Sequence, residues 1–431
     1  MLGVNRELKQ LQESGKHIGV GLVGAGQMGR GMISQIASMN GMKVVATADI
    51  NLDSITSAYR NAGLEEADIA TAENKEDADK AIAEGKSVAL TDAGLMSELD
   101  GVDVVVDATG VPEVGASVAI KAIENKKHIV MLNVEADITI GYYLYRLAEE
   151  NGVIYTGSAG DEPGAIMELY DFADALGFDV VALGKGKNNP LNLEANPDSV
   201  KEVAKEKGSS PKMIASFQDG TKTMVEMNAV ANATGYVPDI PGMHGFSGGV
   251  KDLPEIFRLE ADGGKVQNKY IVEYINGVAP GVFIIIASDK EEVNAELKYL
   301  SMGPGPNYVL YRPYHLTSLE TPLSIAKAYL SGTPTIAPYK GMVAETVTVA
   351  KIDLKKGDHL DSIGGYTVYG QVYKYEEAKA QDALPIGLVN SNLVLQRDIA
   401  KGEVITYADV EGGESSLIWE LRRKQDELLK K

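Results

Sequence analysis

The chain has 431 residues, of which 44% are hydrophobic and 24% are charged, as in an ordinary globular protein. It contains no cysteine, which excludes disulfides, thiolate nucleophiles, Cys-ligated zinc and iron–sulfur clusters. With 41 basic and 61 acidic residues the formal net charge is −20. Because such a field repels nucleic-acid backbones and anionic lipid, we expect neither nucleic acid nor membrane as a partner.

Apolar stretches are too short to cross a bilayer, and the longest covers residues 282–287. Residues 1–15 read as a short amphipathic helix without the long apolar segment of a secretory signal. We therefore expect a cytoplasmic protein. At roughly 150 residues per domain, the length corresponds to about three domains.

Residues 1–155 predict an NAD(P)-binding Rossmann domain of the α/β class, with a doubly wound parallel sheet. The evidence is a series of apolar runs that alternate with helical patterns, as buried parallel strands do. The runs cover residues 18–23, 43–49, 102–107 and 128–132.

The first run leads directly into a glycine motif and then a helix, which is the context that a dinucleotide fingerprint requires. Gly24 permits a tight turn, Gly26 lets the backbone approach a pyrophosphate, and Gly29 lets the helix pack closely on the strand. Gln27 and Met28 lie between these glycines, where the N-terminus of the helix faces the phosphates. These residues are our predicted phosphate-binding loop.

Asp49 follows the second strand, 20 residues after Gly29. A carboxylate in this position accepts hydrogen bonds from the ribose hydroxyls of the cofactor. It also repels a 2′-phosphate, and residues 50–52 offer no arginine to bind one. The sequence therefore favours NAD over NADP.

Two later strand ends are predicted to border the same cofactor, because open α/β sheets bind ligands at the carboxyl ends of their strands. Thr109 and Gly110 follow the strand that ends at Asp107, and Asn133 follows the strand over 128–132. The alternative for Thr109 and Gly110 is a plain Gly/Pro turn.

Residues 156–340 predict a middle α+β domain that holds the substrate and the catalytic groups. Its predicted elements are a helix over 165–176 and strands over 179–183, 270–275 and 282–287. Short alternating strands and glycine turns over 341–412 predict a small β domain. Residues 413–431 predict a C-terminal amphipathic helix.

A basic segment, Gly184-Lys-Gly-Lys-Asn188, follows the first strand of the middle domain. In a chain of charge −20, Lys185 and Lys187 are suited to bind an anionic group, and a desolvated lysine can titrate near neutrality. The glycines would allow close approach of a ligand, and Asn188 would hold substrate hydroxyls. The alternative is an exposed turn with solvated lysines.

Further candidates for proton transfer are Glu162 and His315. Glu162 starts a predicted helix, so it is either a helix-capping charge or a carboxylate for acid–base chemistry. With Glu168 it would also suit a hard divalent metal, and the need for a metal stays open. His315 lies in a polar segment, where it is either a site residue or a structural cap. Glu226, Asn228, Asn232 and His244 are further polar candidates.

Six longer motifs resemble those of homoserine-dehydrogenase-like oxidoreductases with a C-terminal SAF domain. The resemblance is closest to the subgroup that is 1-deoxy-D-xylulose-5-phosphate reductoisomerase-like, to which D-apionate oxidoisomerases are related. The motifs occupy residues 107–115, 133–137, 160–163, 184–192, 232–239 and 312–320.

The resemblance implies an enzyme that couples nicotinamide-dependent hydride transfer to rearrangement of a small polyhydroxylated sugar acid or sugar phosphate. The chain departs from true homoserine dehydrogenases at residues 133–136 and lacks their Asp-x-x-x-Lys helix. We expect a small-molecule substrate, NAD or NADP, and a homo-oligomer. The alternatives are a homoserine-type or polyol dehydrogenase without rearrangement, and a cofactor-bound sugar-acid sensor.

Overall fold

The computed structural model describes residues 3–430 and divides into two compact units. The first unit comprises residues 1–164, 316–337 and 421–431, and the second comprises 165–315 and 338–420. This division crosses the predicted domain boundaries. Residues 316–337 join the N-terminal unit, and the predicted small β domain packs with the middle of the chain.

The first unit contains a seven-stranded parallel sheet in the order β3-β4-β2-β1-β5-β6-β7, which confirms the predicted doubly wound fold. Strand order reverses between β1 and β5, the place where open α/β sheets bind ligands. The strands are β1 (Ile18–Val23), β2 (Met42–Ala48), β3 (Ile69–Thr71), β4 (Ser87–Leu90), β5 (Val104–Asp107), β6 (His128–Met131) and β7 (Tyr155–Gly157). The outer strands β3 and β4 are short, and the sequence did not predict them.

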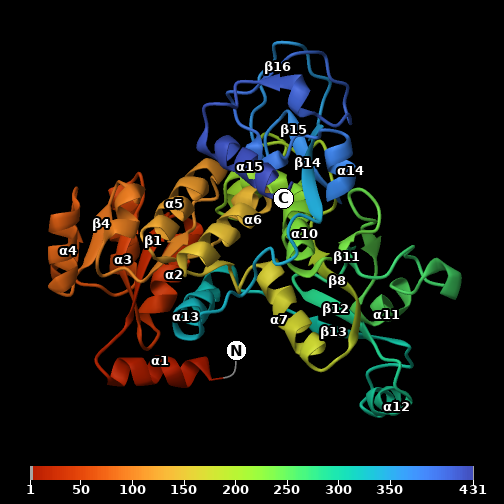
Figure 1. The fold of residues 1–431 in the computed structure, drawn as a ribbon, viewed down its shortest axis with the longest axis horizontal. Helices are drawn as coiled ribbons and strands as arrows, with labels where there is room; N and C mark the ends of the chain where they lie inside the picture. The colour runs from red at the N-terminus through yellow and green to blue at the C-terminus, as the bar shows by residue number, and fades with distance from the viewer. Residues whose placement is uncertain (1–2, 431) are drawn as a thin grey trace. The chain divides into compact units, whose positions relative to one another are not determined.

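Helices pack on both faces of this sheet (Figure 1). They are α1 (Val4–Glu13), α2 (Gln27–Ala37), α3 (Leu52–Asn61), α4 (Lys75–Ala83), α5 (Pro112–Glu124), α6 (Val134–Asn151) and α13 (Thr321–Ser331). The position of α13 explains why residues 316–337 belong to the first unit although they are distant in sequence. Ile325 and Ala326 are fully buried in the cluster formed by β1, β5 and α2, so α13 completes the core of this unit.

The C-terminal helix α15 (Leu417–Leu428) contributes an unusual contact with α6. The Gln425 side chain, fully buried, donates from Nε2 to the Thr139 carbonyl at 3.0 Å and accepts from the Tyr143 amide at 3.0 Å. In a regular α-helix these two backbone groups bond to each other. Gln425 therefore joins α15 to α6 by bonding to two backbone groups in the interior of α6.

We expect Gln425→Ala to destabilise the first unit by about 1–2 kcal/mol, the cost of leaving the Tyr143 amide without its partner, while the Thr139 carbonyl keeps its bond from Arg422 Nη1. The Tyr143 amide should lose protection in hydrogen exchange. Gln10→Ala, at an exposed position of α1, is the matched control and should change neither quantity. Unchanged protection of Tyr143 would contradict the inserted role of Gln425.

The second unit is built on a mixed sheet in the order β10-β11-β8-β12-β13, with β9 paired to β11. Its strands are β8 (Asp179–Lys187), β9 (Val237–Pro238), β10 (Phe246–Ser247), β11 (Ile271–Asn276), β12 (Val282–Ala287) and β13 (Asn307–Arg312). β8 and β11 are parallel, and β12 runs antiparallel to β8. The long helix α10 packs against one face of this sheet, and α11 packs on the other.

The helices of this unit are short apart from two. They are α7 (Glu162–Ala175, whose first residues belong to the first unit), α8 (Lys201–Glu206), α9 (Pro211–Gln218), α10 (Thr221–Thr234), α11 (Leu253–Ile256), α12 (Glu291–Tyr299) and α14 (Tyr375–Ala380). In the part of the chain that the structure describes, no helix is long and apolar enough to span a membrane.

The C-terminal part of the second unit is a set of small antiparallel sheets, as predicted. Its strands are β14 (Ala344–Ala350), β15 (Val368–Lys374), β16 (Val394–Leu395) and β17 (Val410–Glu411). Ala344 and Val372 belong to the same hydrophobic cluster as Met227 and Val230 of α10. This shared core places the β segment in the same unit as the mixed sheet.

Candidate active site

The glycine loop between β1 and α2 has the geometry that dinucleotide binding needs. Gly24 has a φ of 102°, and a Cβ there would lie 2.9 Å from the Ala108 carbonyl oxygen. A Cβ at Gly29 would lie 1.9 Å from the Gly24 oxygen, so that helix and strand pack at the closest approach. Gly26, in contrast, has open space around it. The two outer glycines are required by packing, and the middle one leaves room for a ligand.

The next backbone groups in this loop are those of Gln27 and Met28, at the start of α2. Gly26 is the N-cap of α2, and it provides no side-chain cap for the first amides of the helix. Gln27 is exposed and Met28 is half-buried. Free amides and the positive end of the helix dipole suit a pyrophosphate group.

Asp49 lies directly after β2, beside the glycine loop. Its Oδ2 accepts a hydrogen bond from the Ala25 amide at 2.7 Å, and its Oδ1 accepts one from the Asn51 amide at 2.9 Å. These bonds fix the carboxylate at the carboxyl edge of the sheet. The side chain of Ile50 is almost fully exposed next to it and brings no positive charge.

The loop after β5 is held by a buried carboxylate. Asp107 accepts hydrogen bonds from the hydroxyl and amide of Thr109, at 2.7 and 3.0 Å, and from Asn133 Nδ2 at 3.0 Å. Burial raises the pKa of Asp107. Asn133 also donates to the Val111 carbonyl, at 2.9 Å, and caps α6. Asn133 is fully buried, so this network positions Thr109 and the exposed Gly110 at the strand ends.

Lys185 and Lys187 lie within β8, two residues apart on one face, and each is only 6% exposed. β8 therefore continues four residues beyond the predicted strand, and the alternative of an exposed turn with solvated lysines is wrong. The glycines have a different role from the predicted one. A Cβ at Gly184 would lie 2.4 Å from the Phe283 ring, and one at Gly186 would lie 2.2 Å from the backbone of Ala279. They serve the packing of the sheet.

The two lysines meet different partners. Lys185 forms a buried ion pair with Glu226 of α10. Lys187 donates from Nζ to the Phe217 carbonyl at 2.5 Å, at the end of α9. Burial, reinforced by the charge of Lys185, lowers the pKa of Lys187 to about 8. Lys185 is thus engaged by a carboxylate, whereas Lys187 can exchange a proton near neutral pH.

The remaining predicted site residues are distributed over the two units. Asn188 follows the end of β8 in the second unit and is exposed. His315, also in the second unit, is half-buried. Glu162, half-buried at the start of α7, belongs to the first unit. In the same segment as His315, the Arg312 guanidinium is 3.1 Å from the Glu168 carboxylate and stacks over the Tyr314 ring.

Of the further polar candidates, three lie on α10, and Glu226 pairs with Lys185 of β8. Asn232 Oδ1 accepts from the amides of Val343 and Ala344, at 2.9 and 3.1 Å, and Asn228 bonds to the Thr346 hydroxyl at 3.1 Å. The two asparagines therefore hold the start of β14. Their role in the structure is to join the β segment to α10.

A second polar cluster of this unit surrounds His244. Its Nε2 lies 3.0 Å from Asp239 Oδ2, and burial lowers its pKa. The fully buried Glu273 accepts hydrogen bonds from the amides of His244, Gly245 and Tyr274, and burial raises its pKa to about 7. Sequence analysis did not identify Glu273, because a single acid within an apolar strand has no pattern that distinguishes it.

Comparisons with known proteins assign both parts of this chain. Residues 24–156 match the family model of the homoserine dehydrogenase NAD-binding domain, and residues 160–321 match that of the oxidoreductase DRL catalytic domain. Among curated proteins, none matches the sequence. Similar solved structures include a probable dehydrogenase from Thermotoga maritima, with 12% identity and a TM-score of 0.44 over 75% of this chain and 92% of that one.

Another similar structure is scyllo-inositol dehydrogenase from Lactobacillus casei, solved with NAD(H) and scyllo-inositol. It is 13% identical, with a TM-score of 0.41 over 75% of this chain and 93% of that one. The two family matches, together with the geometry of the glycine loop, support an NAD(P)-dependent oxidoreductase, in which one segment is similar to the homoserine dehydrogenase NAD-binding domain and another to the DRL catalytic domain.

Proposed function

We propose that the chain transfers a hydride between a nicotinamide cofactor and a hydroxyl-bearing carbon of a small polyhydroxylated anion, coupled to rearrangement of its carbon skeleton. The observation that carries the proposal is the buried lysine pair of β8. A chain of charge −20 holds Lys185 and Lys187 side by side in its interior, one of them with a pKa of about 8. Such a pair suits an anionic substrate with an exchangeable hydroxyl proton.

The hydrogen bonds of Lys187 support a role in binding. An ammonium group has three donors. Among the described residues, the Phe217 carbonyl is the acceptor that Lys187 contacts. The remaining donors suit a carboxylate, phosphate or hydroxyl oxygen of a sugar acid or sugar phosphate.

The chemistry divides between cofactor and protein. A bound nicotinamide supplies the acceptor or donor of the hydride. When the substrate hydroxyl is oxidised, its proton passes to the neutral amine of Lys187, and in reduction the ammonium returns it. Asn188 is assigned to substrate hydroxyls, and Glu162 and His315 to polarising oxygens or moving protons. The match to the DRL catalytic domain supports the oxidoreductase part of this proposal, and the coupled rearrangement rests on the motif resemblance alone.

Calorimetry with NAD and NADP is the first test. We expect NAD to bind at least 10-fold more tightly, because the Asp49 carboxylate beside the glycine loop repels a 2′-phosphate. The double variant Asp49→Ser with Ile50→Arg should reverse the preference. Tighter binding of NADP to the unmodified chain would overturn this reading of Asp49 and favour a reductive role on a sugar phosphate.

A screen of sugar acids and sugar phosphates with the preferred cofactor then tests the reaction. The absorbance of the reduced nicotinamide reports turnover, and carbon-labelled substrate followed by NMR reports the carbon skeleton. We expect a product with a migrated carbon–carbon bond. A product with the original skeleton would support a simple dehydrogenase, and binding without any change in absorbance would support a sensor.

A further inference from the structure

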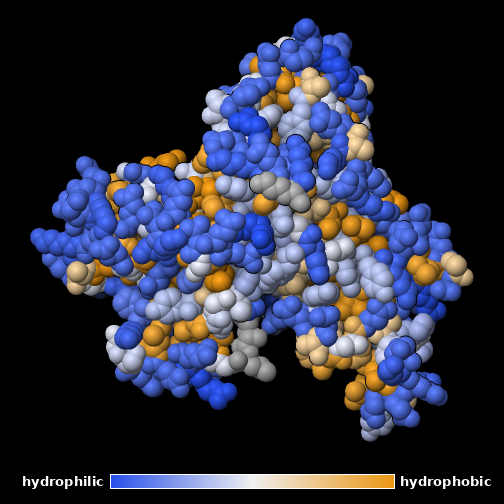
Figure 2. Space-filling model, in the orientation of Figure 1, coloured by the Kyte–Doolittle hydropathy of each residue, from blue (hydrophilic) through white to orange (hydrophobic). Residues whose placement is uncertain are grey.

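Helix α12 connects β12 to β13 and stands apart from the core of the second unit (Figure 1). It has nine residues, and none of them is buried. Helices of this length are marginal in water unless a face packs against something. Tyr299 is 82% exposed, and the adjacent Leu300 is 63% exposed. Hydrophobic residues lie among hydrophilic ones on this arm (Figure 2).

The exposed face of α12 has a defined composition. Glu292, Ala295, Glu296 and Tyr299 follow the three- and four-residue spacing of one helical face, and all four are exposed. The face therefore presents an aromatic ring flanked by carboxylates. Tyr is the type of residue that anchors protein interfaces, because it buries a large ring and keeps a polar tip.

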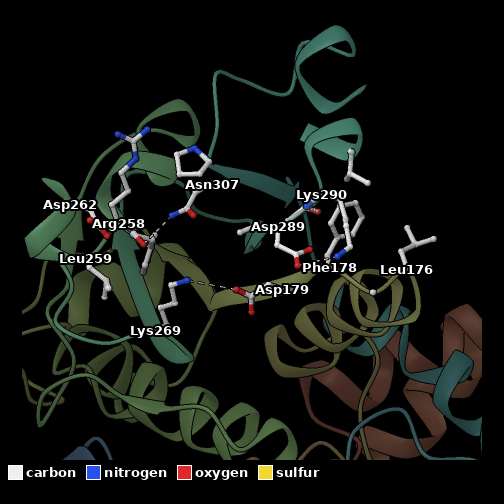
Figure 3. A pocket seen from close by; sticks show the side chains of 16 residues that line it. Leu176, Phe178, Asp179, Arg258, Leu259, Asp262, Lys269, Asp289, Lys290 and Asn307 are labelled. Atoms are coloured by element: carbon white, nitrogen blue, oxygen red, sulfur yellow. Dashed lines mark hydrogen bonds and ion pairs between the residues drawn. The ribbon is translucent and has the colours of Figure 1, made fainter. Parts of the chain in front are cut away.

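A groove of about 1130 Å³ begins at the foot of the same helix. It lies where β8 begins and β12 ends, at the opposite end of β8 from Lys187, so it is separate from the candidate active site. Figure 3 shows Arg258 and Asn307 on one side of the groove and Phe178 on the other. Its apolar walls come from Leu176, Phe178, Phe257, Leu259 and Val293.

Three acids and three bases line the groove, and among the described residues two ion pairs leave Arg258 and Asp262 outside them. Lys269 lies 3.8 Å from Asp179, and Lys290 lies 3.0 Å from Asp289. Arg258 donates from Nη2 to the Gly305 carbonyl at 2.9 Å. Its Nε is buried without a hydrogen-bond partner among the described residues. An occupant that brings a carboxylate and an aromatic ring would satisfy both Arg258 and the apolar walls.

We propose that α12 of a second copy of this chain occupies the groove, in a twofold-symmetric dimer. The helix face and the groove belong to the same unit of the chain. A twofold axis can therefore place α12 of each copy in the groove of the other copy, which makes the interface isologous. Tyr299 enters the apolar part of the groove, and Glu292 or Glu296 of the partner copy compensates Arg258. Within its own chain α12 packs through Leu297, and the contact with the second copy would cover the exposed face that carries Tyr299.

Sedimentation velocity of the full chain tests the proposal. Protein concentrations from about 0.1 to about 50 µM cover the range of usual interface dissociation constants. We expect a dimer whose dissociation constant rises about 30-fold in Tyr299→Asp, the loss that is typical of an interface anchor. Glu296→Arg should also weaken the dimer. Ile352→Asp, another exposed apolar position of the same unit, is the matched control and should leave it unchanged.

Crosslinking distinguishes this interface from any other, because the chain has no cysteine. We expect a bismaleimide to join Tyr299→Cys chains to Leu259→Cys chains when the two are mixed. Either variant alone should give a much lower yield. A monomer at 50 µM, a dimer indifferent to Tyr299→Asp, or no crosslink in the mixture would overturn the proposal, and the last two would indicate another surface or another partner for α12.

Discussion

Replacing Lys187 by methionine should lower kcat by about 10² to 10⁴-fold, the usual contribution of a positioned proton-transfer group, and leave NAD affinity unchanged. Methionine has a similar length but neither charge nor exchangeable proton. The groups assigned to the cofactor, the glycine loop and Asp49, are in the first unit, and Lys187 is assigned to the substrate proton, so its replacement leaves the assigned cofactor-binding groups unchanged. Stopped-flow turnover and NAD calorimetry on the same preparation measure both quantities.

The pH dependence gives an independent readout of the same residue. Burial lowers the pKa of Lys187 to about 8, so the neutral amine is populated above that pH and the ammonium below it. Oxidation needs the neutral amine as base, so its rate should rise as the pH passes through about 8. Reduction needs the ammonium as acid, so its rate should fall over the same range.

Lys355→Met, at an exposed lysine of the same unit, is the matched control and should retain the rate and the pH profile. A Lys187→Met enzyme that turns over at a near-normal rate would remove the lysine pair from the mechanism. So would a variant that is slow but keeps the inflection near pH 8, because another group would then be the base.

Lys351→Met should destabilise the second unit by about 3–5 kcal/mol, the cost of breaking a buried ion pair from one side. The ammonium of Lys351 is buried and uses all three of its donors. It bonds to Asp219 Oδ2 at 2.9 Å and to the carbonyls of Ala195 and Gly365 at 2.6 and 2.8 Å. Methionine would leave the buried carboxylate of Asp219 and two carbonyls without their donor.

Urea unfolding followed by Trp419 fluorescence measures this loss. Trp419 is the single tryptophan of the chain, and it lies in the second unit, where its Nε1 donates to the Leu388 carbonyl at 3.1 Å. Lys355→Met again serves as control, because its pair with Asp398 is exposed to solvent and contributes little to stability. Adding Asp219→Asn to Lys351→Met should recover part of the lost stability, since neither member of this buried pair then carries a charge. A loss no larger than that of the control would contradict the structural role of Lys351.

Local pattern was sufficient to predict the geometry of the glycine loop between β1 and α2. The role of Gly29 depends on its contact with Gly24, between the adjacent elements β1 and α2, so the spacing of the two glycines predicts it. The close neighbour of Gly24 is Ala108, after β5, but its positive φ is a local property of the turn. The same is true of Asp49, whose position is set by the end of β2. The lysines of β8 were identified as candidates because two cations between glycines are unusual in an acidic chain.

Groups that pair across long sequence distances could not be predicted in this way. Lys351 and Asp219 are 132 residues apart, and neither has neighbours that distinguish it from a surface charge. Glu226 was identified as a candidate, but its pairing with Lys185 depends on how α10 packs against β8. The burial that lowers the pKa of Lys187 arises in the same packing.

The sequence by itself determined the doubly wound sheet, the glycine loop and the class of cofactor, because strand periodicity and glycine spacing are local properties of the chain. The tertiary structure decided the limits of the units and the chemistry of the lysines. Residues 316–337 complete the core of the first unit through α13, and β14 shares a core with α10. Burial and pairing depend on the whole packed core, so they emerge only when distant segments meet.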